Sequence, residues 1–246
     1  MKPKVGIFDF TGCEGCELQI VNMEDEILDL LGLIEPVNWR EAVTEQSDDY
    51  DIAIVEGAIT RPGEVERLQK IRENAKVLVA LGACAHLGGV NCLKNHMDPG
   101  DVSRYVYGEA AGYFDTFAAR PLSAVVKVDY AIPGCPVDKA EVLEVLKALL
   151  VGKKPPIPNH AVCVECKMAD NVCVFDKGMV CLGPVTRAGC GAICPSYGNR
   201  CEGCRGLVEE PNVNGYRSVL TERGLTVADI LAQFRLFDGY LEVAKS

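Results

Sequence analysis

The sequence has no long hydrophobic run, and this limits the classes of protein to which it can belong. No stretch approaches the ~18 consecutive apolar residues of a membrane-spanning helix, so we expect no contact with a membrane. The opening residues MKPKVGIFDF contain only a short apolar run that ends around Asp9, which is unlike a secretory signal. No twin-arginine motif precedes the first cysteines. We therefore expect a cytoplasmic protein.

Basic residues are also scarce. The chain has 25 Lys and Arg against 35 Asp and Glu, a net charge of −10. Nucleic-acid binding requires clustered cations to neutralise phosphates, so we expect no nucleic-acid partner. Residues 82–89 are glycine-rich but lack the Gly-Lys-Ser/Thr ending of a phosphate-binding loop. With 48% apolar and 24% charged residues, the composition is that of an ordinary globular protein.

Short apolar runs alternate with amphipathic segments over residues 1–152. This pattern predicts strands at Val5–Phe10, Asp51–Val55, Val77–Leu81 and Val125–Ile132. It predicts helices at Glu17–Leu31, Glu64–Asn74 and Lys139–Leu150. Alternating strands and helices indicate an α/β fold, a flavodoxin-like doubly wound parallel sheet with helices on both faces.

The composition changes after the Pro-rich stretch KKPPIP at residues 153–158. Residues 160–206 have few bulky apolar side chains and eight cysteines, so we expect this segment to need metal in order to fold. Ordinary helical patterning returns near the end, most clearly at Thr226–Phe237. The sequence thus predicts two domains, a sheet domain at 1–152 and a small cysteine-rich domain with a helical C-terminal tail at 153–246.

The thirteen cysteines are the most unusual feature of the sequence. In a reducing compartment so many thiols indicate metal binding. Cys13, Cys16, Cys84 and Cys135 each follow a predicted strand, and the carboxyl ends of parallel strands meet at one edge of a sheet. A redox dithiol, a structural zinc and a [4Fe–4S] cluster all remain compatible with this spacing. The solitary positions of Cys84 and Cys135 favour the cluster.

A second group of cysteines lies within about forty residues of the cysteine-rich segment. Its eight members form two complete sets of four, and they are Cys163, Cys166, Cys173, Cys181, Cys190, Cys194, Cys201 and Cys204. Cys194-Pro195 is similar to the ending of ferredoxin cluster motifs. The count alone does not exclude zinc, but three sets of four on one chain are more typical of an electron relay.

Taken together, these motifs resemble the small subunit of [NiFe] hydrogenases. The resemblance rests on the Cys-x-x-Cys after the first strand, on Gly-x-Cys-Ala-x-x-Gly-Gly, on Gly-Cys-Pro, and on the stretch CLGPVTRAGCGAICP at 181–195. It covers residues 4 to about 240. The similarity is strongest to the soluble, cytoplasmic group, which includes sulfhydrogenase delta subunits and the small subunits of F420-reducing and F420-non-reducing hydrogenases.

The resemblance implies a chain with three [4Fe–4S] clusters. The proximal set would be Cys13, Cys16, Cys84 and Cys135, facing a nickel–iron centre in a separate large subunit. The medial set would be Cys190, Cys194, Cys201 and Cys204, and the distal set Cys163, Cys166, Cys173 and Cys181. Exchange of one ligand between the last two sets, as in ferredoxins, stays open. A further iron–sulfur or flavin subunit is the expected second partner, and no catalytic residue is expected on this chain.

Two positions depart from relatives in this family. Exported hydrogenases use a histidine as one distal ligand, whereas this chain has Cys163 in the comparable position. Some F420-reducing relatives use an aspartate near the third strand as a proximal ligand. Here Glu56 follows that strand, and because four cysteines are already present we interpret it as a helix-capping or interface carboxylate.

Several other residues near the motifs have simpler interpretations. Cys92 is expected to be a free thiol, and His86, His96 and His160 are expected not to be ligands. Glu14 and Glu17 flank the first two cysteines and are typical of a helix N-terminus, although a role in proton transfer stays open. For Arg187 and Arg205 the sequence leaves two interpretations, compensation of cluster charge or simple solvation.

Two other functions compete with the hydrogenase hypothesis. The first is an electron-transfer subunit of another oxidoreductase, such as the complex I relative. That relative has adjacent cysteines in place of Cys13-x-x-Cys16 and lacks the eight-cysteine segment. The second is a zinc-bound structural protein, which metal analysis would distinguish. No flavin or nucleotide motif is evident, so the terminal electron acceptor is not predicted.

Overall fold

A five-stranded parallel sheet forms the N-terminal part of the computed structural model, which describes residues 2–44 and 46–240. The strand order is β2-β1-β3-β4-β5, the flavodoxin-like order. The strands are β1 (Lys4–Asp9), β2 (Glu35–Trp39), β3 (Ile52–Glu56), β4 (Val77–Leu81) and β5 (Tyr130–Ile132). All four strand pairings are parallel, so the predicted doubly wound α/β fold is confirmed.

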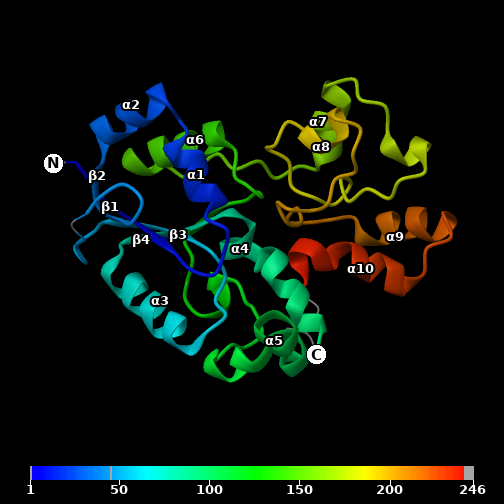
Figure 1. Cartoon of the computed structure of the whole chain (residues 1–246). Coiled ribbons are helices and arrows are strands. Elements are labelled where there is room, and N and C mark those ends of the chain that lie inside the picture. Colours follow the sequence, from blue (N-terminus) through cyan, green and yellow to red (C-terminus); the bar gives the residue numbers. More distant parts are fainter. Residues whose placement is uncertain (1, 45, 241–246) are drawn as a thin grey trace.

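Helices cover both faces of the sheet (Figure 1). In chain order they are α1 (Gly15–Val21), α2 (Asp25–Leu33), α3 (Pro62–Asn74), α4 (Gly82–Leu87), α5 (Pro99–Tyr107) and α6 (Lys139–Leu150). Short 3₁₀ helices η1 (Gly89–His96), η2 (Gly108–Tyr113) and η3 (Leu122–Ala124) lie between β4 and β5. One core packs α1, α2 and α6 against the sheet through residues such as Ile20, Leu30 and Val145. The opposite core includes Leu68 and Ile71 of α3.

The burial of each strand explains its place in the sheet. All five residues of β3 are buried, as are four of the five in β4, which agrees with their continuous apolar sequences. The edge strand β2 is more exposed and contains Pro36, which an edge position tolerates because one side of the strand has no partner. Its sequence EPVNW lacks an apolar run, and it was not predicted.

Two predicted elements differ from the structure. The helix predicted at Glu17–Leu31 is divided into α1 and α2 by a turn that includes Glu24, whose φ of 52° is left-handed. The strand predicted at Val125–Ile132 is reduced to Tyr130–Ile132. The residues that follow η3 are irregular, and only the last three of the predicted strand pair with β4. Apolar content does not distinguish a strand from a buried loop.

The cysteine-rich segment has little regular structure. It contains α7 (Val162–Met168), η4 (Val174–Lys177) and α8 (Ile193–Ser196), followed by α9 (Val213–Glu222) and α10 (Val227–Asp238). Tyr216 and Leu220 of α9 pack on Leu182 and Val185, and α10 returns to contact η1 and α4. The helical tail is thus confirmed.

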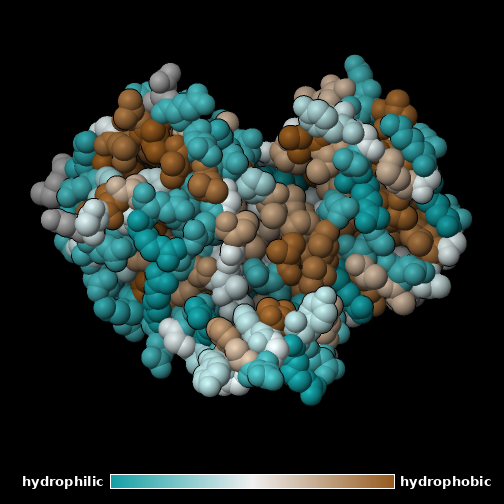
Figure 2. All heavy atoms as spheres, in the orientation of Figure 1, coloured by the Kyte–Doolittle hydropathy of each residue, from teal (hydrophilic) through white to brown (hydrophobic). Residues whose placement is uncertain are grey.

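Figure 2 shows a notch in the surface between the part of the molecule that contains α6 and the part that contains α7. None of the helices in the described residues is long and apolar enough to cross a membrane.

The burial of Asp238 at the end of α10 leads us to expect that stability depends on pH. Asp238 ends this helix, and burial raises its pKa from 3.8 to about 6. Because the folded state binds the proton more tightly, native stability falls as pH rises from about 4 to about 6, and the loss is complete above that range. Asp238→Asn removes a cost of up to about 3 kcal/mol. At pH 7 the variant should melt at a higher temperature than the wild type, and near pH 4 the two should converge.

Thermal unfolding followed by circular dichroism from pH 4 to pH 8 tests this expectation. The exposed aspartate Asp101, which pairs with Arg104, provides the control, because Asp101→Asn removes a carboxylate that is not buried in the protein. A constant difference between wild type and D238N over the whole range would show that Asp238 does not titrate with folding.

Candidate metal centres

The four cysteines of the proximal set converge at the carboxyl edge of the sheet. The loop after β1 carries Cys13, and Cys16 lies in α1. Cys84 lies in α4, which begins directly after β4, while Cys135 follows β5. The thiols are close enough to raise one another's pKa values. For Cys84 burial is the largest cause, Cys135 and Cys13 are the next largest, and the pKa rises to about 12.

Glycines allow the backbone to approach these thiols closely. A Cβ atom on Gly82 would lie 2.3 Å from Sγ of Cys16, and one on Gly89 would lie 3.0 Å from Sγ of Cys84. Both glycines have a positive φ, of 81° and 58°, which a side chain would strain. Backbone atoms rather than side chains therefore lie next to the proximal cysteines. Such an arrangement allows backbone N–H groups to approach the sulfurs of a cluster.

Glu56 holds the start of α1 in place. It is the last residue of β3 and is almost fully buried. Its carboxylate accepts hydrogen bonds from the backbone N–H groups of Glu17 at 2.7 Å and Cys16 at 3.3 Å. Burial nevertheless raises the pKa of Glu56. The interpretation of Glu56 as a helix-capping carboxylate is confirmed.

The two glutamates beside the proximal set have different environments. Glu14 is partly exposed and forms an ion pair with Arg40. Glu17 is buried, and one of its carboxylate oxygens accepts a hydrogen bond from the Trp39 indole at 3.1 Å. Its other oxygen has no hydrogen-bond partner among residues 2–44 and 46–240. Burial, with repulsion from Glu56, raises the pKa of Glu17 to about 8. The sequence did not indicate the contact with Trp39, because the two residues are 22 positions apart.

The distal set lines one small cavity. Cys163 and Cys166 lie one turn apart on α7, so both point to the same side of that helix. All four cysteines of the set border the cavity together with apolar neighbours such as Val174 and Phe175. Burial raises the pKa of the Cys163 thiol to about 11, and the other three thiols of the set add to this rise.

The medial set surrounds a larger cavity of about 760 Å³. Its four cysteines line this cavity together with Cys135 of the proximal set and Ile193. Burial raises the pKa of Cys204 to about 11, an effect opposed by the nearby backbone N–H of Cys135. Each of the two C-terminal sets thus has all four of its cysteines on one cavity.

Two backbone contacts arrange the three sets in a row. The N–H of Cys135 reaches the sulfur of Cys204, which joins the proximal set to the medial set. The N–H of Cys201 donates to the sulfur of Cys181 at 3.2 Å, which joins the medial set to the distal set. The medial cysteines therefore lie beside both the proximal and the distal cysteines.

The donor chemistry of each set fits an iron–sulfur cube. Each set supplies four thiols, the usual ligand number for a [4Fe–4S] cluster. Burial and mutual repulsion keep most of these thiols protonated, so a strongly cationic centre is needed to hold them as thiolates. Within the described ranges, no three His, Cys, Asp or Glu side chains lie close enough to hold a single metal ion.

The remaining residues singled out in the sequence lie outside these sets. Cys92 is a fully buried free thiol that donates to the carbonyl of Ala119 at 3.4 Å. Burial and two nearby arginines lower the pKa of His86 to about 4, so it stays neutral. The exposed His160 is not among the residues that line the cavity of the distal set.

Neither Arg187 nor Arg205 has a fully solvated side chain. Arg187 is half-buried and donates to the carbonyls of Pro158 and Leu207. Arg205 is only 1% exposed and forms an ion pair with Glu141 of α6. The interpretation that Arg205 is simply solvated is therefore wrong.

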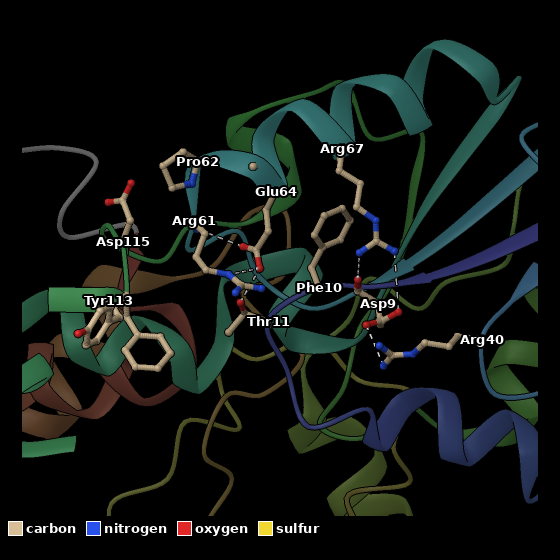
Figure 3. Close-up of a pocket in the computed structure, with 12 residues that line it drawn as sticks. Asp9, Phe10, Thr11, Arg40, Arg61, Pro62, Glu64, Arg67, Tyr113 and Asp115 are labelled. Carbon is tan, nitrogen blue, oxygen red and sulfur yellow. Dashed lines mark hydrogen bonds and ion pairs between the residues drawn. The ribbon is translucent and has the colours of Figure 1, made fainter. Parts of the chain in front are cut away.

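Another hollow, of about 610 Å³, lies between the end of β1 and the start of α3 (Figure 3). Its charged side chains other than Asp115 pair with one another. Asp9 accepts from Arg40 at 3.0 Å and lies 3.9 Å from Arg67, and Arg61 lies 3.3 Å from Glu64. Because these charges are already matched, we assign no ligand to this hollow.

Comparison with known proteins gives consistent results. The family described as NADH ubiquinone oxidoreductase, 20 Kd subunit, matches residues 13–149. Sulfhydrogenase 2 subunit delta of Pyrococcus furiosus is 39% identical over 221 residues, covering 89% of this chain and 92% of that protein. One subunit of the F420-non-reducing hydrogenase vhu of Methanocaldococcus jannaschii is 32% identical over 239 residues, covering 84% of this chain and 83% of that protein.

A solved structure supports the same relationship. One chain of an NAD+-reducing [NiFe]-hydrogenase in the H2-reduced state superimposes with a TM-score of 0.58 at 27% identity, covering 64% of this chain and 96% of that chain. The hydrogenase relatives also extend well beyond residue 149, where the family match ends. This chain therefore belongs to the NADH ubiquinone oxidoreductase 20 kDa subunit family and, within it, to the small subunits of [NiFe] hydrogenases, the electron-transfer parts of oxidoreductase complexes.

Proposed function

We propose that this chain relays electrons through three [4Fe–4S] clusters between the nickel–iron site of a large subunit and a further redox subunit. The observation that carries the proposal is the row of three four-cysteine sets, joined by the contacts between Cys135 and Cys204 and between Cys201 and Cys181. We assign the proximal cluster to residues 1–152 and the medial and distal clusters to residues 153–246. When bound, the clusters supply reversible one-electron transfer.

The protein's own contribution is to hold, separate and shield these sites. Glu56 fixes the N–H groups at the start of α1, so that Cys16 keeps its position. Tyr216 donates to the carbonyl of Cys181 at 2.8 Å and braces the distal set from α9. Glu165 of α7 accepts from the N–H groups of Gly189 and Ala192, which holds the loop around Cys190. The medial cavity is bordered by residues of the sheet domain, of the cysteine-rich segment and of α10.

The surface is consistent with partner subunits. Large apolar side chains are exposed on α2 at Leu28 and Leu33, where Figure 2 shows brown atoms, and in the cysteine-rich segment at Met168 and Tyr197. Where exposed apolar side chains form a contiguous patch, that patch is typical of a protein interface. The relatives named above are subunits of multisubunit hydrogenases, which supports a large-subunit partner. The thirteen free cysteines favour the reducing environment of the cytoplasm.

Metal analysis of the complex tests the proposal. The chain, purified anaerobically with its partners from the native source, should contain about twelve irons and about twelve acid-labile sulfides, or four of each per cluster. Nickel should be found on a co-purifying large subunit. The same iron and sulfide without nickel would retain the relay but replace the hydrogenase by another oxidoreductase. Zinc without sulfide would overturn both.

A further inference from the structure

A buried ion pair joins the cysteine-rich segment to the sheet. Arg205 directly follows Cys204, and its side chain is 1% exposed. Its guanidinium donates to both carboxylate oxygens of Glu141, at 2.6 and 2.8 Å. Glu141 lies in the first turn of α6, which packs on the sheet. This two-point geometry restrains both distance and orientation, which a single hydrogen bond does not.

The same guanidinium also holds the chain near two cysteines. Its Nη1 donates to the carbonyl of Pro133 at 2.7 Å, and its Nε donates to the carbonyl of Ala188 at 2.7 Å. Pro133 lies two residues before Cys135 of the proximal set, and Ala188 lies two residues before Cys190 of the medial set. One side chain therefore joins the proximal loop, the medial loop and α6.

The space around the Arg205 side chain tolerates few substitutions. A Cβ atom on Gly189 would lie 2.3 Å from Nη2 of Arg205, and the φ of this glycine is 113°. A lysine would keep the charge but could not make four hydrogen bonds in one plane. Solvation cannot explain this arrangement, and charge compensation alone would not require contacts to two carbonyls beside cysteines.

We propose that Arg205, anchored by Glu141, is a positioning residue that sets the separation and orientation of the proximal and medial clusters. The inference rests on the proposed function, because it concerns the passage of electrons between these two sites. Electron transfer between centres depends steeply on their separation. A small displacement of Cys204 or Cys190 relative to Cys135 therefore slows the relay without removing either cluster.

Two variants of the full complex, Arg205→Lys and Glu141→Gln, test this assignment. The first measurement is electron paramagnetic resonance of the reduced protein, which detects the magnetic interaction between neighbouring clusters. The second is the ratio of hydrogen-dependent acceptor reduction to hydrogen–deuterium exchange, since exchange at the partner's nickel–iron site needs no electron through this chain. Arg187→Lys is the matched control, because within the described residues the Arg187 side chain donates hydrogen bonds to Pro158 and Leu207, both in residues 153–246.

We expect both variants to retain about twelve irons per chain, the number for three cubes of four. Their magnetic interaction should change, and the ratio of reduction to exchange should fall, because the rate of electron transfer decreases exponentially with the separation of the two centres. R187K should match the wild type in both measurements. If a single variant does not assemble, the double variant R205M/E141L removes both charges together, which a core tolerates better, and it should show the same two changes.

Wild-type magnetic interaction and a wild-type ratio in iron-replete variants would overturn the positioning role. An equal change in R187K would also overturn it, because the effect would then not depend on contacts across the two segments. Absence of iron and sulfide from the unaltered complex would instead overturn the proposed function, and the inference with it.

Discussion

Replacement of Cys84 by serine is expected to lower the iron content from about twelve to about eight per chain, because one cube contains four irons. A serine hydroxyl is a poor ligand compared with a thiolate, and Cys84 is held in α4, which begins directly after β4. Hydrogen-dependent reduction of an acceptor should be abolished, because the proximal cluster receives electrons first under the proposed function.

Cys92→Ser is a matched control for this experiment. Cys92 is buried in η1, near α4, and carries the same thiol, but it donates to the carbonyl of Ala119 instead of joining a set. A hydroxyl can make the same hydrogen bond. This variant should keep about twelve irons and most of the activity. Full iron content in C84S, or a loss of four irons in C92S, would contradict the assignment of the proximal set.

Gly82→Ala is the second change with a large expected effect. An added Cβ would lie 2.3 Å from Sγ of Cys16, and the φ of 81° is strained for any L side chain. Relief would require Cys16 or the start of α4 to move. We expect destabilisation of about 3 kcal/mol or more and faster loss of iron on exposure to a chelator, measured by thermal unfolding and by the decay of visible absorbance.

Gly32 provides the control for the glycine experiment. It lies in α2, and nothing lies within 4 Å of the position that an added Cβ would occupy. Gly32→Ala should leave iron release unchanged and raise stability by up to about 1 kcal/mol, because alanine favours a helix. Equal stability and equal iron release in G82A and the wild type would show that the close approach of backbone to Cys16 is not needed.

Local patterns in the sequence predicted much of the fold. Val77–Leu81 and Lys139–Leu150 have the predicted bounds, because a continuous apolar run and a 3.6-residue period report directly on burial. β2 was missed because its burial depends on β1 beside it and not on its own composition. The break between α1 and α2 was missed because a left-handed residue such as Glu24 has no strong signal in sequence.

The number of cysteines and the expected convergence of Cys13, Cys16, Cys84 and Cys135 were evident from the sequence, because a parallel sheet brings the ends of its strands together. The division of the other eight cysteines into two sets of four came from the resemblance to hydrogenase small subunits. Only the tertiary structure decided which side chains support these sets. The contacts of Glu56 with the start of α1 and of Arg205 with Glu141 join residues 39 to 64 positions apart. Such contacts depend on how separate elements pack, and a polar residue has the same local pattern whether it is solvated or buried with a partner.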